Sequence, residues 1–186
     1  MSAPTEDPDE KRRRIYKLPD SERLIRSAVA YLDRYASSSE NLRRVLERKV
    51  ARAAYAHQRD PSEFSEMIGH TVERCVALGL VDDTAYAETR AYSLRRKGAS
   101  RRQIEAKLAA KGVPKALIER VIAADTTDET SAARRLAKRR RLGPWRTRGQ
   151  RADYSERDMA ALCRAGFSYD VARTVISSED EPGDLF

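Results

Sequence analysis

The densest run of like charge in this chain lies between residues 132 and 152, where nine basic side chains occur without one acid. They are Arg134, Arg135, Lys138, Arg139, Arg140, Arg141, Arg146, Arg148 and Arg151. Cations crowded in this way repel one another, and an anionic partner relieves the repulsion. The segment therefore predicts binding of an acidic protein surface or of nucleic-acid phosphates. The alternative is a basic face that meets only solvent.

On a helix through this segment, the small apolar residues Ala133, Leu136 and Ala137 face inward. The outward rows are then Arg134 with Lys138 and Arg141, and Arg135 with Arg139. Arg140 continues the inward stripe, where its aliphatic stem can pack. Trp145, beside the helix break at Gly143-Pro144, is expected to cover the helix end rather than to stack on a base.

A second basic cluster lies at the turn between two expected helices. It consists of Arg95, Arg96, Lys97, Arg101 and Arg102. Two of these cations, Arg101 and Arg102, stand at a helix start, where positive charge opposes the helix macrodipole. That local conflict predicts a binding role, and a solvated surface is again the alternative.

Other reactive side chains predict no catalysis. Adjacent carboxylates at Asp82 and Asp83 suit the capping of a helix start better than a metal site. Cys75 and Cys163 fall on apolar stripes, and His70 lies opposite the stripe of its helix. The sequence contains no P-loop, glycine-rich nucleotide loop or HExxH motif. We expect no enzyme activity, no metal and no cofactor.

Composition points in the same direction. The 186 residues are 40% apolar and 35% charged, with a net charge of +8, which favours a helical protein with a polyanionic or acidic partner. There is no CxxC pair, no secretory signal and no apolar run long enough for a membrane span. A cytoplasmic monomer is expected.

Glycine positions divide the chain into helices. Three expected helices end at a glycine followed by one apolar residue, after which a new helix begins, as at Gly79-Leu80, Gly112-Val113 and Gly166-Phe167. Glycine accepts the left-handed conformation that ends a helix, and the next residue packs back on the last turn. A helix-ending glycine turn that occurs three times predicts tandem helical modules.

Apolar periodicity predicts about nine helices. They begin near residues 21, 38, 60, 82, 100, 115, 129, 155 and 168. A serine opens the middle helix of each set of three, at Ser38, Ser100 and Ser155. The predicted fold is all-α, an elongated tandem array of three three-helix repeats. Its parts are a disordered charged tail over 1–19, repeats over 20–81, 82–125 and 126–177, and a flexible acidic tail over 178–186.

Three landmarks of the sequence resemble the RecX family of recombinase regulators. They are Gly79-Leu80-Val81-Asp82-Asp83-Thr84-Ala85-Tyr86-Ala87, then Gly98-Ala99-Ser100 with Leu108-Ala109-Ala110-Lys111-Gly112-Val113, and Cys163-Arg164-Ala165-Gly166-Phe167-Ser168. The order and spacing of these landmarks carry the resemblance, which extends over about residues 22–178.

The resemblance implies tandem three-helix repeats that lie in the groove of a RecA-type recombinase filament. It further implies a regulator of DNA repair, recombination and the SOS response, acting mostly by inhibition of ATP hydrolysis, strand exchange and co-protease activity. The rival hypothesis is a non-specific nucleic-acid-binding helical protein that acts without a recombinase. A sequence-reading helix-turn-helix is disfavoured, because the second helix of the Gly112 turn exposes Glu119 and two alanines.

Overall fold

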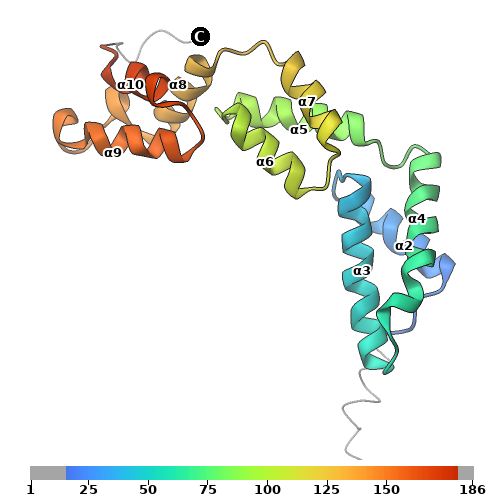
Figure 1. Cartoon of the computed structure of the whole chain (residues 1–186). Coiled ribbons are helices and arrows are strands. Elements are labelled where there is room, and N and C mark those ends of the chain that lie inside the picture. The colour runs from blue at the N-terminus through green and yellow to red at the C-terminus, as the bar shows by residue number, and fades with distance from the viewer. Residues whose placement is uncertain (1–15, 180–186) are drawn as a thin grey trace, which may run out of the picture. The chain divides into compact units, whose positions relative to one another are not determined.

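The computed structural model describes residues 16–179, and this range forms nine α-helices, two short 3₁₀ helices and no strand (Figure 1). The α-helices are α2 (Ser21–Leu32), α3 (Ser39–Ala56), α4 (Ser65–Ala77), α5 (Asp83–Arg96), α6 (Arg101–Ala110), α7 (Lys115–Ala124), α8 (Glu129–Arg140), α9 (Arg151–Arg164) and α10 (Tyr169–Ser177). The all-α helical array predicted from the sequence is confirmed for this range.

The chain divides into two compact units, residues 1–86 and 87–186, and the boundary falls inside α5. In the first unit, α2, α3 and α4 enclose an apolar core that includes Leu24, Leu46, Ile68 and Cys75. In the second unit, α8, α9 and α10 share a core, and α6 packs on α7. Trp145 packs against the core of α8 to α10, as expected.

Segment 16–19 was expected to belong to a disordered tail, but it lies against the first unit. Leu18 packs on the core, and its carbonyl accepts a hydrogen bond from Arg23 at 3.2 Å. The Tyr16 carbonyl lies 2.9 Å from His57 Nε2. Apolar Leu18 therefore extends the folded region beyond the point where charge patterning alone would start it. The rest of the expected N-terminal tail, and residues 180–186 of the C-terminal one, lie outside the described residues.

The glycine turns are confirmed, and a fourth copy joins them. Gly79, Gly112 and Gly166 have φ values of 68°, 72° and 92°. The residue after each glycine donates its N–H to the carbonyl five residues earlier, as in Leu80 to Cys75 at 2.9 Å. Gly98 has φ 76°, and Ala99 donates to Leu94 in the same way at 3.1 Å.

Side-chain caps mark most of the helix starts, whereas α4, α7 and α9 begin without one. Ser38, Ser100 and Ser168 each accept a hydrogen bond from a backbone N–H three residues on, and Asp60 with Glu63 forms the expected capping box. The prediction for Ser155 is wrong, because α9 begins four residues earlier, at Arg151. No cap fixes that start; instead the Arg151 guanidinium donates to the Ile176 carbonyl at 2.6 Å.

Candidate binding surface

The last two turns of α8 and its C-cap residue carry a cluster of exposed cations that we call the basic end. Its members are Arg135, Lys138, Arg139, Arg140 and Arg141. The opposite face of α8 is fully covered, with Ala132, Ala133 and Ala137 at 0% exposure. Cations at the carboxyl end of a helix are stabilised by the macrodipole. The apolar face therefore anchors the helix while the basic end projects into solvent.

Two arginines of α8, one from the predicted outward rows and one from the inward stripe, lie elsewhere than expected. Arg134 is half-buried rather than outward, and Arg140 is exposed rather than inward. For Arg140 the reason is the end of α8, because Arg141 adopts the left-handed conformation, with φ 57° and ψ 50°, and turns the chain. Leu142 then enters the core, at 9% exposure, in the place that the helical pattern gave to Arg140.

The second cluster is split by burial. Arg96, Lys97, Arg101 and Arg102 are exposed. The guanidinium carbon of Arg96 lies 5.8 Å from the centroid of the exposed Tyr92 ring, a cation–π distance. Arg95, in contrast, is only 4% exposed, so its prediction as a surface binding residue is wrong.

Arg95 is the centre of an internal network that we call the Arg95 junction. Its guanidinium lies 2.6 Å from a carboxylate oxygen of Asp125 and 2.6 Å from one of Glu129. It also donates to the carbonyls of Ala99 at 2.8 Å and Thr127 at 3.1 Å. A buried cation needs this degree of pairing to offset its desolvation. Arg95 thus ties α5 to the start of α8.

The charge state of Asp125 follows from the same contacts. Burial pushes the pKa of this carboxyl upward, but hydrogen bonds from Thr127 and the nearby Arg95 guanidinium outweigh burial. The pKa of Asp125 therefore lies below its ordinary value, and the carboxylate stays charged beside Arg95.

Arg101 also has an internal explanation. Its backbone N–H donates to Glu129 at 3.2 Å, and its guanidinium donates to the Asp125 carbonyl at 3.1 Å. Glu129 thus supplies the anion that the first turn of α6 lacks. The conflict between Arg101 and the helix dipole is resolved within the protein, so it no longer indicates a partner.

Close backbone contacts join the same elements. A Cβ at Gly98 would lie 2.6 Å from the Leu136 nitrogen and 2.7 Å from the Ala132 oxygen, both in the backbone of α8. The Ser100 hydroxyl donates to the Ala165 carbonyl at 2.7 Å. The turn between α5 and α6 therefore packs directly on α8 and on the turn after α9.

Two further arginines of the basic run have partners inside the protein. Arg146 pairs with both carboxylate oxygens of Asp158, which is 2% exposed, and its guanidinium carbon lies 4.1 Å from the centroid of the Tyr154 ring. The pKa of Arg146 is raised above its ordinary value, chiefly by the hydrogen bonds to Asp158. Arg151 caps the end of α10 through the Ile176 and Ser178 carbonyls. Nothing in the sequence indicated that Asp158 of α9 would be buried.

The adjacent carboxylates have separate structural roles. Asp82 accepts from the N–H groups of Thr84 and Ala85 at 2.8 and 3.0 Å, as a helix cap does. Asp83 instead accepts from the backbone and hydroxyl of Ser39 at 2.7 and 2.6 Å, a contact that spacing did not predict. Among residues 16–179, no group of three or more His, Cys, Asp or Glu side chains is placed to hold a metal ion.

The exposed cations lie at both ends of α8. Arg101 contacts Glu129 at the start of the helix, and Arg140 of the basic end lies about 16 Å away along its axis. No carboxylate among the described residues pairs with any side chain of the basic end. In α7, the outward positions are Lys115, Ala116, Glu119, Arg120 and Ala123, a poor set for reading base edges. The arrangement suits contact with an extended anionic surface.

Comparison with known proteins gives a consistent result. A family model described as the second three-helix domain of RecX matches residues 82–122, which contain α5, α6 and most of α7. Over 178 residues, the chain is 42% identical to Regulatory protein RecX of Myxococcus xanthus (strain DK1622), covering 92% of this chain and 95% of the relative. The alignment thus spans both compact units.

More distant relatives carry the same name. Regulatory protein RecX of Agrobacterium fabrum is 28% identical over 85% of this chain and 84% of its own length. Regulatory protein RecX of Mycobacterium tuberculosis (strain ATCC 25177 / H37Ra) is 36% identical over 74% of this chain and 82% of its own length. No solved structure matches the chain. In the described part of the chain, no helix combines the length and apolar character that a membrane crossing requires.

Proposed function

This chain belongs to the family of RecX regulatory proteins, and from that premise we propose that it binds a RecA-type recombinase filament and restrains it. The activities restrained are DNA-dependent ATP hydrolysis, strand exchange and co-protease activity. In this role the protein acts by binding in the filament groove, without catalysis and without a cofactor. Its place is the cytoplasm, where it regulates DNA repair, recombination and the SOS response.

The basic end of α8 is the observation that best supports a contact with an acidic surface. Its cations have no carboxylate partner among residues 16–179, whereas Arg95, Arg101 and Arg146 have theirs. Unpaired surface cations raise the local concentration of an anionic partner and speed its association. Tandem helical modules raise the affinity further, because contacts with neighbouring protomers of the filament reinforce one another through effective concentration.

The direct test is an ATPase titration of recombinase filaments on single-stranded DNA. We expect hydrolysis to slow at substoichiometric amounts of the protein, and the protein to sediment with filaments locked by a non-hydrolysable nucleotide. Full hydrolysis at an equimolar ratio, with no co-sedimentation, would contradict the proposal.

Salt dependence separates the recombinase proposal from the nucleic-acid rival. Binding through about 6–10 phosphate contacts loses about 10³–10⁵ in affinity between 50 and 200 mM salt. We expect binding to bare DNA to be weak and steeply salt-dependent, and binding to the filament to be tighter with a shallower slope. Equal affinities and slopes for both would favour the rival.

A further inference from the structure

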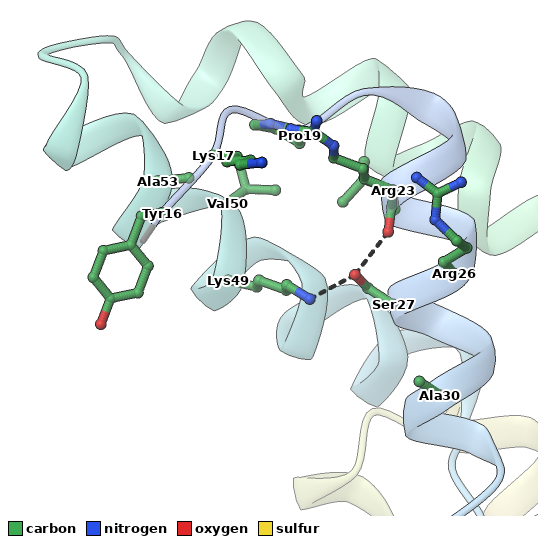
Figure 2. Close-up of a pocket in the computed structure, with 11 residues that line it drawn as sticks. Tyr16, Lys17, Pro19, Arg23, Arg26, Ser27, Ala30, Lys49, Val50 and Ala53 are labelled. Atoms are coloured by element: carbon green, nitrogen blue, oxygen red, sulfur yellow. Dashed lines mark hydrogen bonds between the residues drawn. The ribbon is translucent and has the colours of Figure 1, made fainter. Parts of the chain in front are cut away.

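The first unit contains a groove between residues 16–19, α2 and α3, with a volume of about 390 Å³. Apolar and basic side chains line it together, as Figure 2 shows. The apolar set is Pro19, Leu24, Ala30, Val50 and Ala53, and the basic set is Lys17, Arg23, Arg26 and Lys49. No acidic side chain lines the groove.

A chain of hydrogen bonds positions one of the cations. Lys49 Nζ donates to the Ser27 hydroxyl, and that hydroxyl donates to the Arg23 carbonyl at 2.7 Å (Figure 2). The ammonium group of α3 is thereby held across the groove against α2. A neutral hydroxyl leaves the positive charge of Lys49 uncompensated.

The basic side chains of the groove differ in their pairing. Arg23 lies 3.2 Å from a carboxylate oxygen of Asp20, and Arg26 lies 3.2 Å from one of Glu22. Within the described residues, neither Lys17 nor Lys49 pairs with a carboxylate. Two positive charges are thus available to an anionic ligand at the rim.

The apolar part of the groove selects the kind of ligand. Its side chains are aliphatic, and the ring of Tyr16 points away from Ser27 and Lys49 (Figure 2). Bases of single-stranded nucleic acid bind by stacking on aromatic rings, and the lining of this groove offers only one, that of Tyr16. Burial of an aliphatic side chain against this aliphatic surface is favourable instead, by about 25 cal/mol of free energy per Å² buried.

We propose that this groove is a docking site for an acidic peptide segment that inserts one aliphatic side chain. The volume accommodates one large side chain with its flanking backbone. The insertion covers Pro19 and Ala30, the apolar lining residues that the fold leaves accessible, while flanking carboxylates pair with Lys17 and Lys49. The site lies in the first unit and shares no residue with the basic end of α8, so it stands apart from the recombinase proposal.

Fluorescence anisotropy with the full chain tests this proposal. The probe is a short labelled peptide of glutamate and aspartate with one central leucine. We expect saturable binding that weakens about tenfold or more when the leucine is replaced by serine. A double variant, Lys17→Gln with Lys49→Gln, should weaken binding by a similar factor. The matched control is Arg48→Gln with Arg52→Gln, which removes the same charge from exposed positions of α3 outside the groove and should leave binding nearly unchanged.

A variant with a larger side chain in the groove tests whether the peptide binds there. Ser27→Leu fills the space beside Lys49 and should abolish peptide binding while helix content and the unfolding midpoint stay close to wild type. Peptide affinity that is unchanged in this variant and in the lysine double variant would overturn the proposal. Tighter binding of a labelled oligothymidylate that competes with the peptide and depends on Lys17 and Lys49 would overturn it in favour of nucleic acid. Neutralising the basic end of α8 should leave peptide binding intact.

Discussion

Arg95 is 4% exposed between the carboxylates of Asp125 and Glu129, whereas Arg139 at the basic end of α8 is exposed and pairs with none in the described chain. Both residues belong to runs of basic residues that look alike in the sequence. The first charge is compensated within the fold and supports stability. The second is left to solvent and remains available to a partner. The neighbours of a cation, rather than its position in a basic run, decide which role it takes.

Removing Arg95 should have the largest effect on stability. Arg95→Ala leaves Asp125 and Glu129 without their shared cation, and we expect a loss of about 3–5 kcal/mol in the free energy of unfolding. Urea denaturation followed by circular dichroism measures it. Arg95→Lys keeps the charge but not the planar guanidinium group, so its free energy of unfolding should lie between those of wild type and Arg95→Ala. If Arg95→Ala unfolded at the same urea concentration as wild type, the Arg95 junction would contribute no more to stability than the basic end does.

The backbone contact beside the junction gives the next largest effect. Gly98→Ala combines left-handed strain with a Cβ 2.6 Å from the α8 backbone, so we expect a loss of about 2–4 kcal/mol. Gly79→Ala is the matched control, because its φ of 68° is similar and nothing lies within 4 Å of the added Cβ. That control should lose only about 1–2 kcal/mol. Equal thermal shifts would mean that the packing of Gly98 on α8 adds nothing.

The basic end should show the opposite pattern, with function lost and stability kept. Changing Lys138, Arg139 and Arg140 together to Gln should weaken filament inhibition about tenfold or more, equivalent to about 1.4 kcal/mol. The unfolding free energy should stay within about 0.5 kcal/mol, since these side chains are exposed and Gln is a good helix former.

A triple variant in the first unit controls for net charge. Arg48, Arg52 and Arg74 are exposed on α3 and α4, and changing them to Gln removes the same charge. An ATPase titration of both variants measures the difference. Equal inhibition by the two variants would show that overall charge, and not the basic end, attracts the filament.

Acid should produce the smallest effect at the junction, where Asp125 is one of several carboxyls whose pKa is lowered in the folded state. Because the pKa of Asp125 is lower in the folded state, its contribution to stability is complete above about pH 5 and is lost as the pH falls below about 4 toward the folded pKa. Asp125→Asn should therefore flatten the acid side of the stability profile, measured by urea unfolding between pH 6 and 3. Neutralising the basic end should not change that profile, and a slope identical to wild type for Asp125→Asn would contradict this role.

Periodicity, caps and glycine turns predicted the helices because these signals are local. Ser38, Ser100 and Asp60 lie within three residues of the amides they cap, so sequence spacing is enough to find them. Ser155 failed because a serine before an apolar stripe also occurs inside a helix, and the true start at Arg151 depends on a contact with α10.

The candidate site was predictable only in part, since pairing across distant segments decides it. Arg95 meets partners 30 and 34 residues away. Its spacing from Ala87 and Ala91 places it on the buried face of α5, but local spacing does not identify those distant partners. Arg140 was misplaced because the left-handed turn at Arg141, a non-glycine residue, ends the helical pattern early. Asp158 was missed because a buried acid can be recognised only together with its partner, Arg146.

The hydroxyl of Ser100 accepts from the Gln103 amide at 3.1 Å and donates to the Ala165 carbonyl at 2.7 Å. The amide hydrogen of Gln103 can exchange with solvent deuterium only when that hydroxyl releases it. Because the same atom holds the turn after α9, release of the first turn of α6 and loosening of the α9–α10 turn become one event. The hydrogen-exchange rate of the Gln103 amide then reports opening of the second unit as a whole, rather than fraying of a single helix end.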